Sequence, residues 1–305
     1  MGEAAALGMA ASAAGAGTAM TSLAARLPTT ALAGLEISFA TVAILAALVV
    51  SGQAGDVVGA GAVTLLAVAG SGVIDFAVPQ PIYTRALRVA GLQRTYGVTI
   101  GLFILLTTVG GVVLLGERFT PGLPIGGALI LAGTYLIIVT RWQSEPGADE
   151  GGGGSTAVAA PPRTLERYAV LTVTPVLWTV ATLWLASVGD EMGVLPAAAL
   201  RMAAGTVLLV TFLLSMRRGD LRFAVSRRRD VVTVCLASLG GTCLGNLLYV
   251  YALIEAGAAR TAILTATAPL FAIPFAIVFL REPLTRRVVL GTTLSVTGII
   301  VVVSF

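Results

Sequence analysis

Hydrophobic residues gather in ten long runs along the chain, and each run is about as long as a helix that crosses a lipid bilayer. The runs cover about residues 4–25, 31–50, 60–84, 95–115, 123–140, 168–188, 196–216, 231–254, 258–280 and 287–305. They are continuous rather than alternating with polar residues, which favours helices over the strands of a membrane barrel. The pattern therefore predicts an all-α polytopic membrane protein with ten transmembrane helices.

One long hydrophilic stretch, residues 142–167, separates the first five runs from the last five. It holds the glycine run 151–154 and the pair Pro161-Pro162, a composition typical of a flexible linker. We therefore expect three parts, which are a five-helix unit over residues 1–141, the linker over 142–167 and a second five-helix unit over 168–305.

The composition limits the possible chemistry. Hydrophobic residues make up 57% of the 305 positions and charged residues only 11%, whereas a soluble domain carries about a quarter charged residues. The chain has no histidine, which excludes imidazole metal sites and histidine-based catalysis. Its two cysteines, Cys235 and Cys243, share one apolar run and carry no disulfide or metal signature. We expect no metal, no cofactor and no catalytic residues, so the chain is predicted not to be an enzyme.

All 19 basic residues are arginines, and they are distributed unevenly between the two ends of the predicted helices. Only Arg118, Arg201 and Arg260 would lie on one side of the membrane. The other sixteen would lie on the opposite side, namely Arg26, Arg85, Arg88, Arg94, Arg141, Arg163, Arg167, Arg217, Arg218, Arg222, Arg227, Arg228, Arg229, Arg281, Arg286 and Arg287. Because arginine accumulates in cytoplasmic loops, the linker and the loop 217–229 are predicted to be cytoplasmic and both termini external. Topology and anionic lipid explain these arginines, so no nucleic-acid partner is expected.

Two apolar stretches of the chain repeat each other about 165 residues apart. Glu117, Thr120, Gly126 and Gly133 match Glu282, Thr285, Gly291 and Gly298, and Tyr83 matches Tyr249 after a slip of one residue. Because each half has an odd number of predicted helices, the two halves must be inverted relative to each other in the membrane. Duplicated apolar halves of this kind are typical of secondary transporters.

The ordered, duplicated motifs resemble the EamA branch of the drug/metabolite transporter superfamily over nearly the whole chain. Each five-helix unit of that family has a Tyr-x-x-Ala-Leu-like stretch in its third helix, a proline in its fourth and a Leu-Gly-Glu motif after it. The second half keeps Ala252-Leu253, Pro269 and Glu282. The first half keeps Leu115-Gly116-Glu117, but has Ile104 in place of the proline.

The first half also departs from the family pattern in its second helix. Glu36 occupies the place where the family usually carries arginine, while the second half has Arg201 at the start of its second helix. The resemblance implies transport of small metabolites or drugs. It also implies cytoplasmic termini, whereas the arginine distribution predicts the opposite orientation. We follow the arginine distribution.

Asp75 is the acid that lies deepest within an apolar run. A carboxylate at such a depth is costly unless it is paired, protonated or facing a cavity, so we predict that Asp75 binds the proton of a coupled transporter. The alternative is a structural partner for a polar group or an arginine on another helix. The matching position in the second half is Gly241, so only one half could supply this acid.

Several polar and aromatic side chains in the apolar runs are candidates to contact a substrate. Gln80 and Tyr83 of the third predicted helix correspond to Asn246 and Tyr249 of the eighth, and Trp178 lies in the middle of the sixth. Such pairs in inverted repeats are typical of a central substrate site. Hydrogen bonds between helices, or core packing for Trp178, are the structural alternatives.

Prolines predict breaks in two regions of the helices. A proline removes a backbone hydrogen bond, and broken helices are where such carriers expose backbone groups to substrate. These prolines are Pro79, Pro81, Pro269 and Pro274.

Charged pairs follow the fourth predicted helix of each half. Glu117 and Arg118 occupy this place in the first half, and Arg281 and Glu282 in the second. We predict a structural or gating role for them, because they lie at helix ends rather than in the centre of the bilayer.

These observations predict a secondary transporter of the cell membrane that moves a small organic molecule by alternating access. Proton-coupled export is the first expectation and exchange the second, with a flippase for a lipid-linked substrate as the alternative function. The expected partners are therefore a small-molecule substrate, the lipid bilayer and coupling protons, and the carrier could be a monomer or a homodimer. The chain has no nucleotide-binding motif, so transport driven by ATP is not expected.

Overall fold

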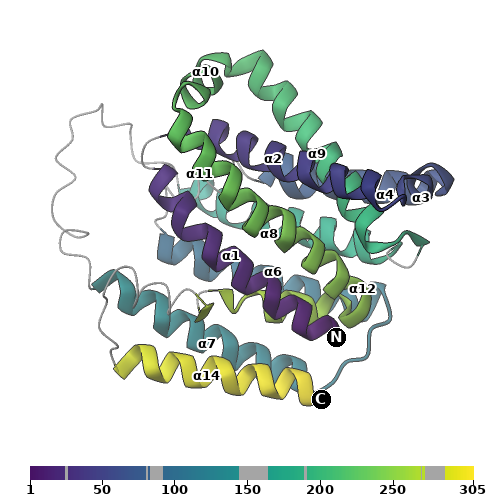
Figure 1. Ribbon diagram of the computed structural model, residues 1–305. Coiled ribbons are helices and arrows are strands. Elements are labelled where there is room, and N and C mark those ends of the chain that lie inside the picture. Colours follow the sequence, from purple (N-terminus) through teal and green to yellow (C-terminus); the bar gives the residue numbers. More distant parts are fainter. Residues whose placement is uncertain are drawn as a thin grey trace.

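The computed structural model describes residues 1–24, 27–79, 82, 92–143, 164–188, 191–268, 270–271 and 286–305. The regular elements in these residues are all helices (Figure 1). In the first half they are α1 (Gly2–Ala24), α2 (Thr29–Val50), α3 (Ala54–Gly59), α4 (Ala62–Gly72), the π-helix η1 (Val73–Ala77), α6 (Leu92–Leu114) and α7 (Gly122–Gln143). In the second half they are α8 (Thr164–Ala186), α9 (Val194–Met216), α10 (Arg218–Ser226), α11 (Arg228–Ser238), the π-helix η3 (Leu239–Cys243), α12 (Leu244–Thr265) and α14 (Arg286–Ser304).

Apolar side chains cover the outside of the bundle as well as its core. The core consists largely of small residues such as Ala40, Ala198 and Ala258, each fully buried. Large apolar side chains point outward instead, and Val207 and Leu236 are both 67% exposed. A helix that is apolar all round belongs in a lipid environment or in the core of a large protein. The outer surface of the bundle therefore suits lipid.

Four of the described helical stretches are long and apolar enough, by length and composition, to cross a membrane. They are Thr30–Val50, Val194–Met216, Arg228–Thr265 and Arg286–Ser304. Four shorter apolar helical stretches accompany them, at Ala62–Ala77, Val98–Leu114, Gly122–Leu136 and Leu171–Ala186. The prediction of an all-α, multi-pass membrane protein is therefore confirmed.

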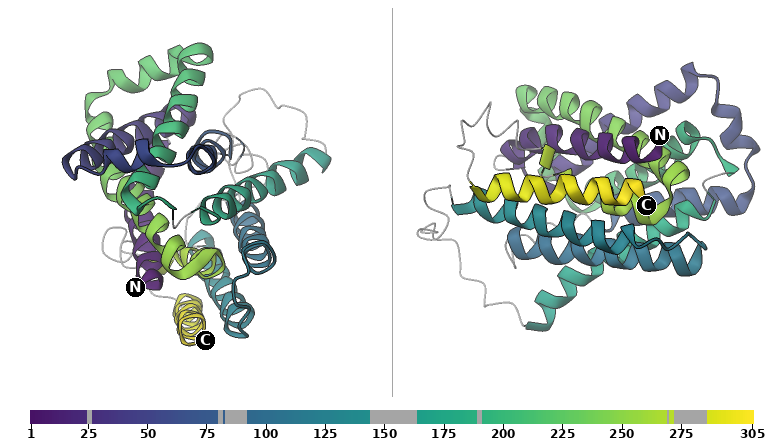
Figure 2. Two further views of the ribbon diagram at one scale, coloured as in Figure 1. Left: turned by 90° about the vertical axis from the view of Figure 1, so that its right-hand side faces the viewer. Right: turned by 90° about the horizontal axis from the view of Figure 1, so that it is seen from below.

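Helices α7 and α14 lie side by side at one edge of the bundle, as Figures 1 and 2 both show. Their contact depends on glycines, because a Cβ on Gly126 would lie 2.7 Å from the Gly298 carbonyl oxygen and a Cβ on Gly298 equally close to that of Gly126. A Cβ on Gly133 would lie 2.4 Å from the carbonyl oxygen of Gly291. Small residues let helix backbones approach closely in membranes. Since Gly126 meets Gly298 and Gly133 meets Gly291, the two helices run antiparallel.

Helices α2 and α9 form a second antiparallel pair. The hydroxyls of Thr41 and Thr206 are hydrogen-bonded at 2.6 Å, and a Cβ on Gly34 would lie 2.2 Å from Cδ1 of Leu213. Thr41 and Thr206 stand 165 residues apart, the same spacing that relates the two halves of the sequence. The helices of this pair therefore meet at matching positions of the two halves.

The chain changes direction within α12, at Gly257. This glycine has φ 82° and ψ 171°, which lie outside the helical range, so two helical segments meet there. The positive φ is one that glycine adopts without a steric penalty. The turn falls between the predicted helices at 231–254 and 258–280, which explains why the helical stretch from Arg228 to Thr265 is longer than a single span needs.

Candidate functional site

Each half of the chain contains one π-helix, and the two occupy matching positions. Adding 166 to the residues of η1, Val73–Ala77, gives 239–243, the residues of η3. The offset of 166 rather than 165 reproduces the one-residue slip between Tyr83 and Tyr249. A π-helix within an α-helix is rare and is frequent at functional sites. Both halves therefore have an irregular backbone segment at the same place.

Proline alone does not account for these π-helices. Pro79, which is buried, follows η1 closely, whereas the matching residue after η3 is Gly245. The second π-helix thus forms without a proline in the corresponding position. The interruption of the helix is a property that both halves share.

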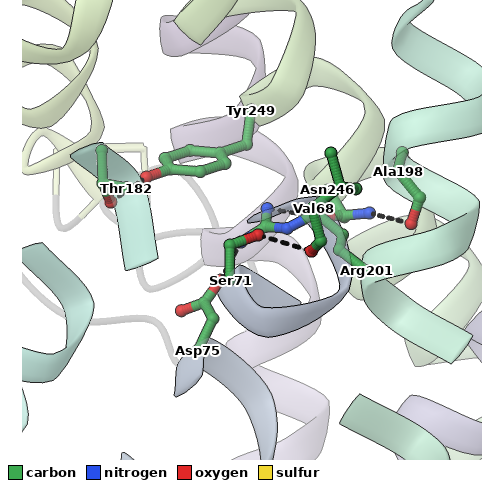
Figure 3. Close-up of polar contacts among 8 residues, drawn as sticks. All are labelled: Val68, Ser71, Asp75, Thr182, Ala198, Arg201, Asn246 and Tyr249. Atoms are coloured by element: carbon green, nitrogen blue, oxygen red, sulfur yellow. Dashed lines mark hydrogen bonds and ion pairs between the residues drawn. The ribbon is translucent and has the colours of Figure 1, made fainter. Parts of the chain in front are cut away.

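Arg201 on α9 is the centre of a buried polar cluster, drawn in Figure 3. Its side chain is only 1% exposed, and its Nη2 atom lies 2.5 Å from Oδ2 of Asp75 in η1. Its Nη1 donates a hydrogen bond of 2.9 Å to Oδ1 of Asn246. The guanidinium carbon also lies 5.2 Å from the ring centre of Phe76 and 5.4 Å from that of Tyr249. Arginine is well suited to such a site because it forms ion pairs and stacks on aromatic rings.

A close approach between α4 and α9 brings Arg201 to Asp75. A Cβ on Gly72 would lie 1.9 Å from the carbonyl oxygen of Arg201, and a Cβ on Gly205 would lie 2.8 Å from the carbonyl oxygen of Gly72. Only glycine at position 72 leaves room for the α9 backbone. The glycines therefore determine that the two opposite charges can meet.

The rest of the cluster holds Arg201 in place. Nδ2 of Asn246 donates to the carbonyl oxygen of Ala198 at 3.2 Å, which orients the amide so that its oxygen faces Arg201. The hydroxyls of Tyr249 and Thr182 are 2.5 Å apart and join α12 to α8. The Nε atom of Arg201 is buried without a hydrogen-bond partner in the described part of the chain. Residues of both halves thus build a charged cluster, in which the described residues leave Nε of Arg201 without an acceptor.

Trp178 lies at the contact between α6 and α8. Its ring meets that of Phe103 edge to face, with 6.1 Å between the ring centres, and the hydroxyls of Thr107 and Thr179 are 3.2 Å apart nearby in sequence. This geometry is one that aromatic pairs prefer in protein interiors. Trp178 therefore has a protein ring on one side.

Glu117 contacts the other half of the chain from the segment between α6 and α7. Its two carboxylate oxygens accept hydrogen bonds from the backbone amides of Ala258, at 2.5 Å, and Ala259, at 3.0 Å. These amides follow Gly257 and begin a new helical segment, whose first N–H groups have no partner within the helix. A carboxylate is favourable there, because it also interacts with the positive end of the helix dipole. Arg118 beside it is exposed.

Seven of the predicted residues lie outside the described part of the chain. They are Gln80, Pro81, Tyr83, Pro269, Pro274, Arg281 and Glu282. Of the other predicted substrate contacts, the structure brings Asn246 and Tyr249 to one cluster with Asp75. Trp178 contacts Phe103 instead, one helical turn before Thr182 on α8.

Arg201 was not predicted to be a site residue from the sequence, where it counts among the arginines of the external side. The structure instead buries it in α9, where it does not report on membrane topology. One signal could have identified it, since Arg201 lies within an apolar run, as Asp75 does. Two opposite charges that are each costly in an apolar environment are expected to pair. The position of Phe76 against the guanidinium had no comparable signal in the sequence.

An all-helical bundle with an apolar outer surface and a charged cluster buried between its halves defines a polytopic membrane protein. The sequence model of the EamA-like transporter family matches residues 1–139 and 168–304. The chain therefore belongs to the EamA-like transporter family. Among solved structures, a crystal structure shares the fold with a TM-score of 0.73 at 17% identity, covering 99% of this chain and 95% of that one. No curated protein matches the chain.

Proposed function

We propose that this membrane transporter is a secondary carrier that moves a small organic metabolite or drug-like molecule by alternating access. The observation that carries the proposal is the Arg201 cluster, in which Asp75 of the first half meets Arg201, Asn246 and Tyr249 of the second. Secondary carriers place their substrate and coupling ions between two repeats, next to interrupted helices. The Arg201 cluster supports the proposal because it lies between residues of the two halves and next to the π-helix η1.

Inverted five-helix repeats, at residues 1–141 and 168–305 on either side of the linker, are part of the proposal. Antiparallel contacts between matching positions support it: Thr41 meets Thr206, and the pair Gly126–Gly298 corresponds to the pair Gly291–Gly133. When residue i of one half contacts residue j of the other half, and the equivalents of i and j make the same contact with the halves exchanged, the two halves are related by a two-fold axis. An axis perpendicular to antiparallel helices is the one expected for inverted repeats.

We further propose that protonation of Asp75 drives export or exchange. A proton on this carboxyl would remove the negative charge that Arg201 now pairs with at 2.5 Å. The released guanidinium, with its unsatisfied Nε, would then be free to bind an acceptor group of the substrate or to move with α9. Proton binding and substrate binding would thus be linked through one ion pair.

The proposed location is the cell membrane, with the linker 142–167 and the loop 217–229 in the cytoplasm. The arginine-rich segment over α10 and the start of α11 supports this orientation, since α10 carries Arg218 and Arg222 and α11 begins with Arg228 and Arg229. Basic residues collect in cytoplasmic loops. Labelling of single cysteines introduced at Gly219 and at Gly55, in a variant without Cys235 and Cys243, would test it in intact cells, because opposite sides of the membrane are expected.

The proposal is tested first by ligand binding and then by transport. Thermal stability of the detergent-purified protein is measured with a panel of amino acids, nucleobases, sugars and lipophilic cations. A compound at 100 times its Kd is expected to stabilise the folded state by about 2.7 kcal/mol. Asp75→Asn and Asn246→Ala should abolish the effect, whereas Val207→Ala on the exposed face of α9 should not.

Counterflow of the stabilising compound in proteoliposomes then decides between a carrier and other functions. Exchange of labelled for unlabelled compound supports the carrier, and a pH gradient should accelerate net uptake in the native protein but not in Asp75→Asn. Unchanged acceleration in Asp75→Asn would remove Asp75 from the coupling step. Activity on polyprenyl- or acyl-linked substrates alone would replace the carrier by the flippase.

A further inference from the structure

Glu36 is a second acid within a membrane-spanning helix, and the proposed coupling step at Asp75 does not involve it. It is the only charged residue of α2, in the candidate span Thr30–Val50. One turn away on either side, at i−4 and i+4, Leu32 and Ala40 are buried, so the carboxyl lies beside an apolar face. Its Oε1 atom accepts a hydrogen bond of 2.5 Å from the hydroxyl of Thr242 in η3.

The repeat relates Glu36 to Arg201, because the two residues are 165 positions apart. Each contacts the π-helix of the other half, since Arg201 meets Asp75 in η1 and Glu36 meets Thr242 in η3. The two contacts differ in charge. Arg201 has an anionic partner, whereas the partner of Glu36 is a neutral hydroxyl.

The structure offers no cation to neutralise Glu36 within its described part. Since Thr41 faces Thr206 and Gly34 lies against Leu213, Glu36 is level with residue 211 of α9, ten positions from Arg201. At 1.5 Å per helical residue, that separation is roughly 15 Å along the helix. Arg201 is also engaged by Asp75 and Asn246.

The other elements packed against α2 do not supply a partner either. The titratable or charged groups on these elements are Glu3 on α1, Arg201 on α9, Arg218, Asp220 and Arg222 on α10, Arg228, Arg229, Asp230 and Cys235 on α11, and Cys243 on η3. No described ion pair includes Glu36. The groups on these elements that do form described ion pairs have other partners, and they are Glu3, Arg201, Asp220 and Asp230. An acid in apolar surroundings without a cation is neutralised by taking up a proton.

We propose that Glu36 is a second proton-binding site of the carrier, which takes up and releases a proton next to η3; this inference rests on the proposed transport function. The hydroxyl of Thr242 suits both states, because it donates to the carboxylate and accepts from the protonated acid. The Glu36 side chain is partly buried, so the site is not sealed on all sides. Glu36 and Arg201 each lie in the first third of two antiparallel helices, so the two sites lie toward opposite faces of the membrane.

Infrared spectroscopy tests this inference without any substrate. The pH-dependent carboxyl C=O bands of the detergent-purified protein are recorded for the native chain, Glu36→Gln, Glu36→Asp, Thr242→Val and Asp75→Asn. One titrating band should be lost in Glu36→Gln and retained in Asp75→Asn and Glu36→Asp. In Thr242→Val the same band should shift, because the acid loses its hydrogen bond. Glu36→Gln keeps the size and an acceptor oxygen for Thr242, and the Thr242→Val spectrum remains decisive if Glu36→Gln does not fold.

The outcomes separate this inference from the transport function on which it rests. A spectrum of Glu36→Gln identical to that of the native protein would overturn the inference, as would a band that sodium ions remove at constant pH, since the site would then bind a metal cation. In transport, Glu36→Gln should lose acceleration by a pH gradient and retain counterflow. Absence of counterflow in the native protein would instead overturn the transport function and leave the infrared result standing.

Discussion

The hydroxyls of Thr41 and Thr206 are joined by a hydrogen bond of 2.6 Å across α2 and α9, and the two residues occupy the same position in the two halves of the chain. A residue that contacts its own equivalent lies on the two-fold axis that relates the halves. Thr41 is buried and Thr206 partly buried, so the bond is largely protected from solvent. This hydrogen bond is therefore one of the contacts that hold the two halves together.

A double-mutant cycle on Thr41→Val and Thr206→Val should give a coupling energy of about 0.6 kcal/mol, the average for hydrogen bonds between membrane helices. The measurement is the free energy of unfolding in mixed micelles. Thr41→Val combined with Thr293→Val on α14 is the matched control, because the hydroxyl of Thr293 bonds within its own helix. No coupling is expected in that control, since distant sites add independently. Equal coupling in both cycles would show that Thr41 and Thr206 do not interact.

Removing one partner of the Arg201–Asp75 ion pair should destabilise the protein more than removing both. Arg201→Gln alone leaves a partly buried carboxylate unpaired, and loss of one partner of a buried pair costs about 3–5 kcal/mol. The double variant Arg201→Gln/Asp75→Asn should recover much of this loss, because no uncompensated charge remains. The melting temperatures of the purified single and double variants measure their order of stability. A double variant less stable than both single variants would contradict the expected charge compensation.

Glu117→Ala should destabilise the helical segment that begins after Gly257. The substitution removes the acceptor of two backbone N–H groups, and hydrogen bonds to a charged group contribute about 1.5–3 kcal/mol. Glu117→Gln keeps one acceptor oxygen and should lose less. Arg118→Ala, at the exposed neighbour, should stay within about 0.5 kcal/mol of the native protein. Hydrogen exchange at the amides of Ala258 and Ala259 should accelerate in Glu117→Ala, and unchanged exchange there would argue against a capping role.

Glycines at the α7–α14 contact should not tolerate a larger side chain. Gly133→Val would place a Cβ 2.4 Å from the Gly291 carbonyl oxygen, and overpacking of this kind costs about 1–3 kcal/mol. Gly101 in α6 is the matched control, because a Cβ there has no neighbour within 4 Å. Gly101→Ala should stabilise the protein by up to about 1 kcal/mol, the difference in helix propensity. The melting temperature should therefore fall in Gly133→Val and rise in Gly101→Ala, relative to the native protein.

The sequence by itself determined the helical, membrane-spanning character of the chain and the spacing of its duplication. Both properties are local or periodic: apolar runs report the lipid environment, and a constant offset between matching residues reports a repeat. For the same reason Asp75 could be recognised as unusual from its apolar neighbours alone. The offset of 165 residues reappears in the contact between Thr41 and Thr206.

Only the tertiary structure decided which groups meet. Asp75 and Arg201 are 126 residues apart, and their contact depends on a backbone approach that Gly72 permits. Glu117 reaches amides 141 and 142 residues away, at a turn created by the positive φ of Gly257. Periodicity places a residue on a face of its own helix, but it does not specify the neighbouring helix or the level at which two helices cross. Pairing is set by packing between segments that are distant in the sequence.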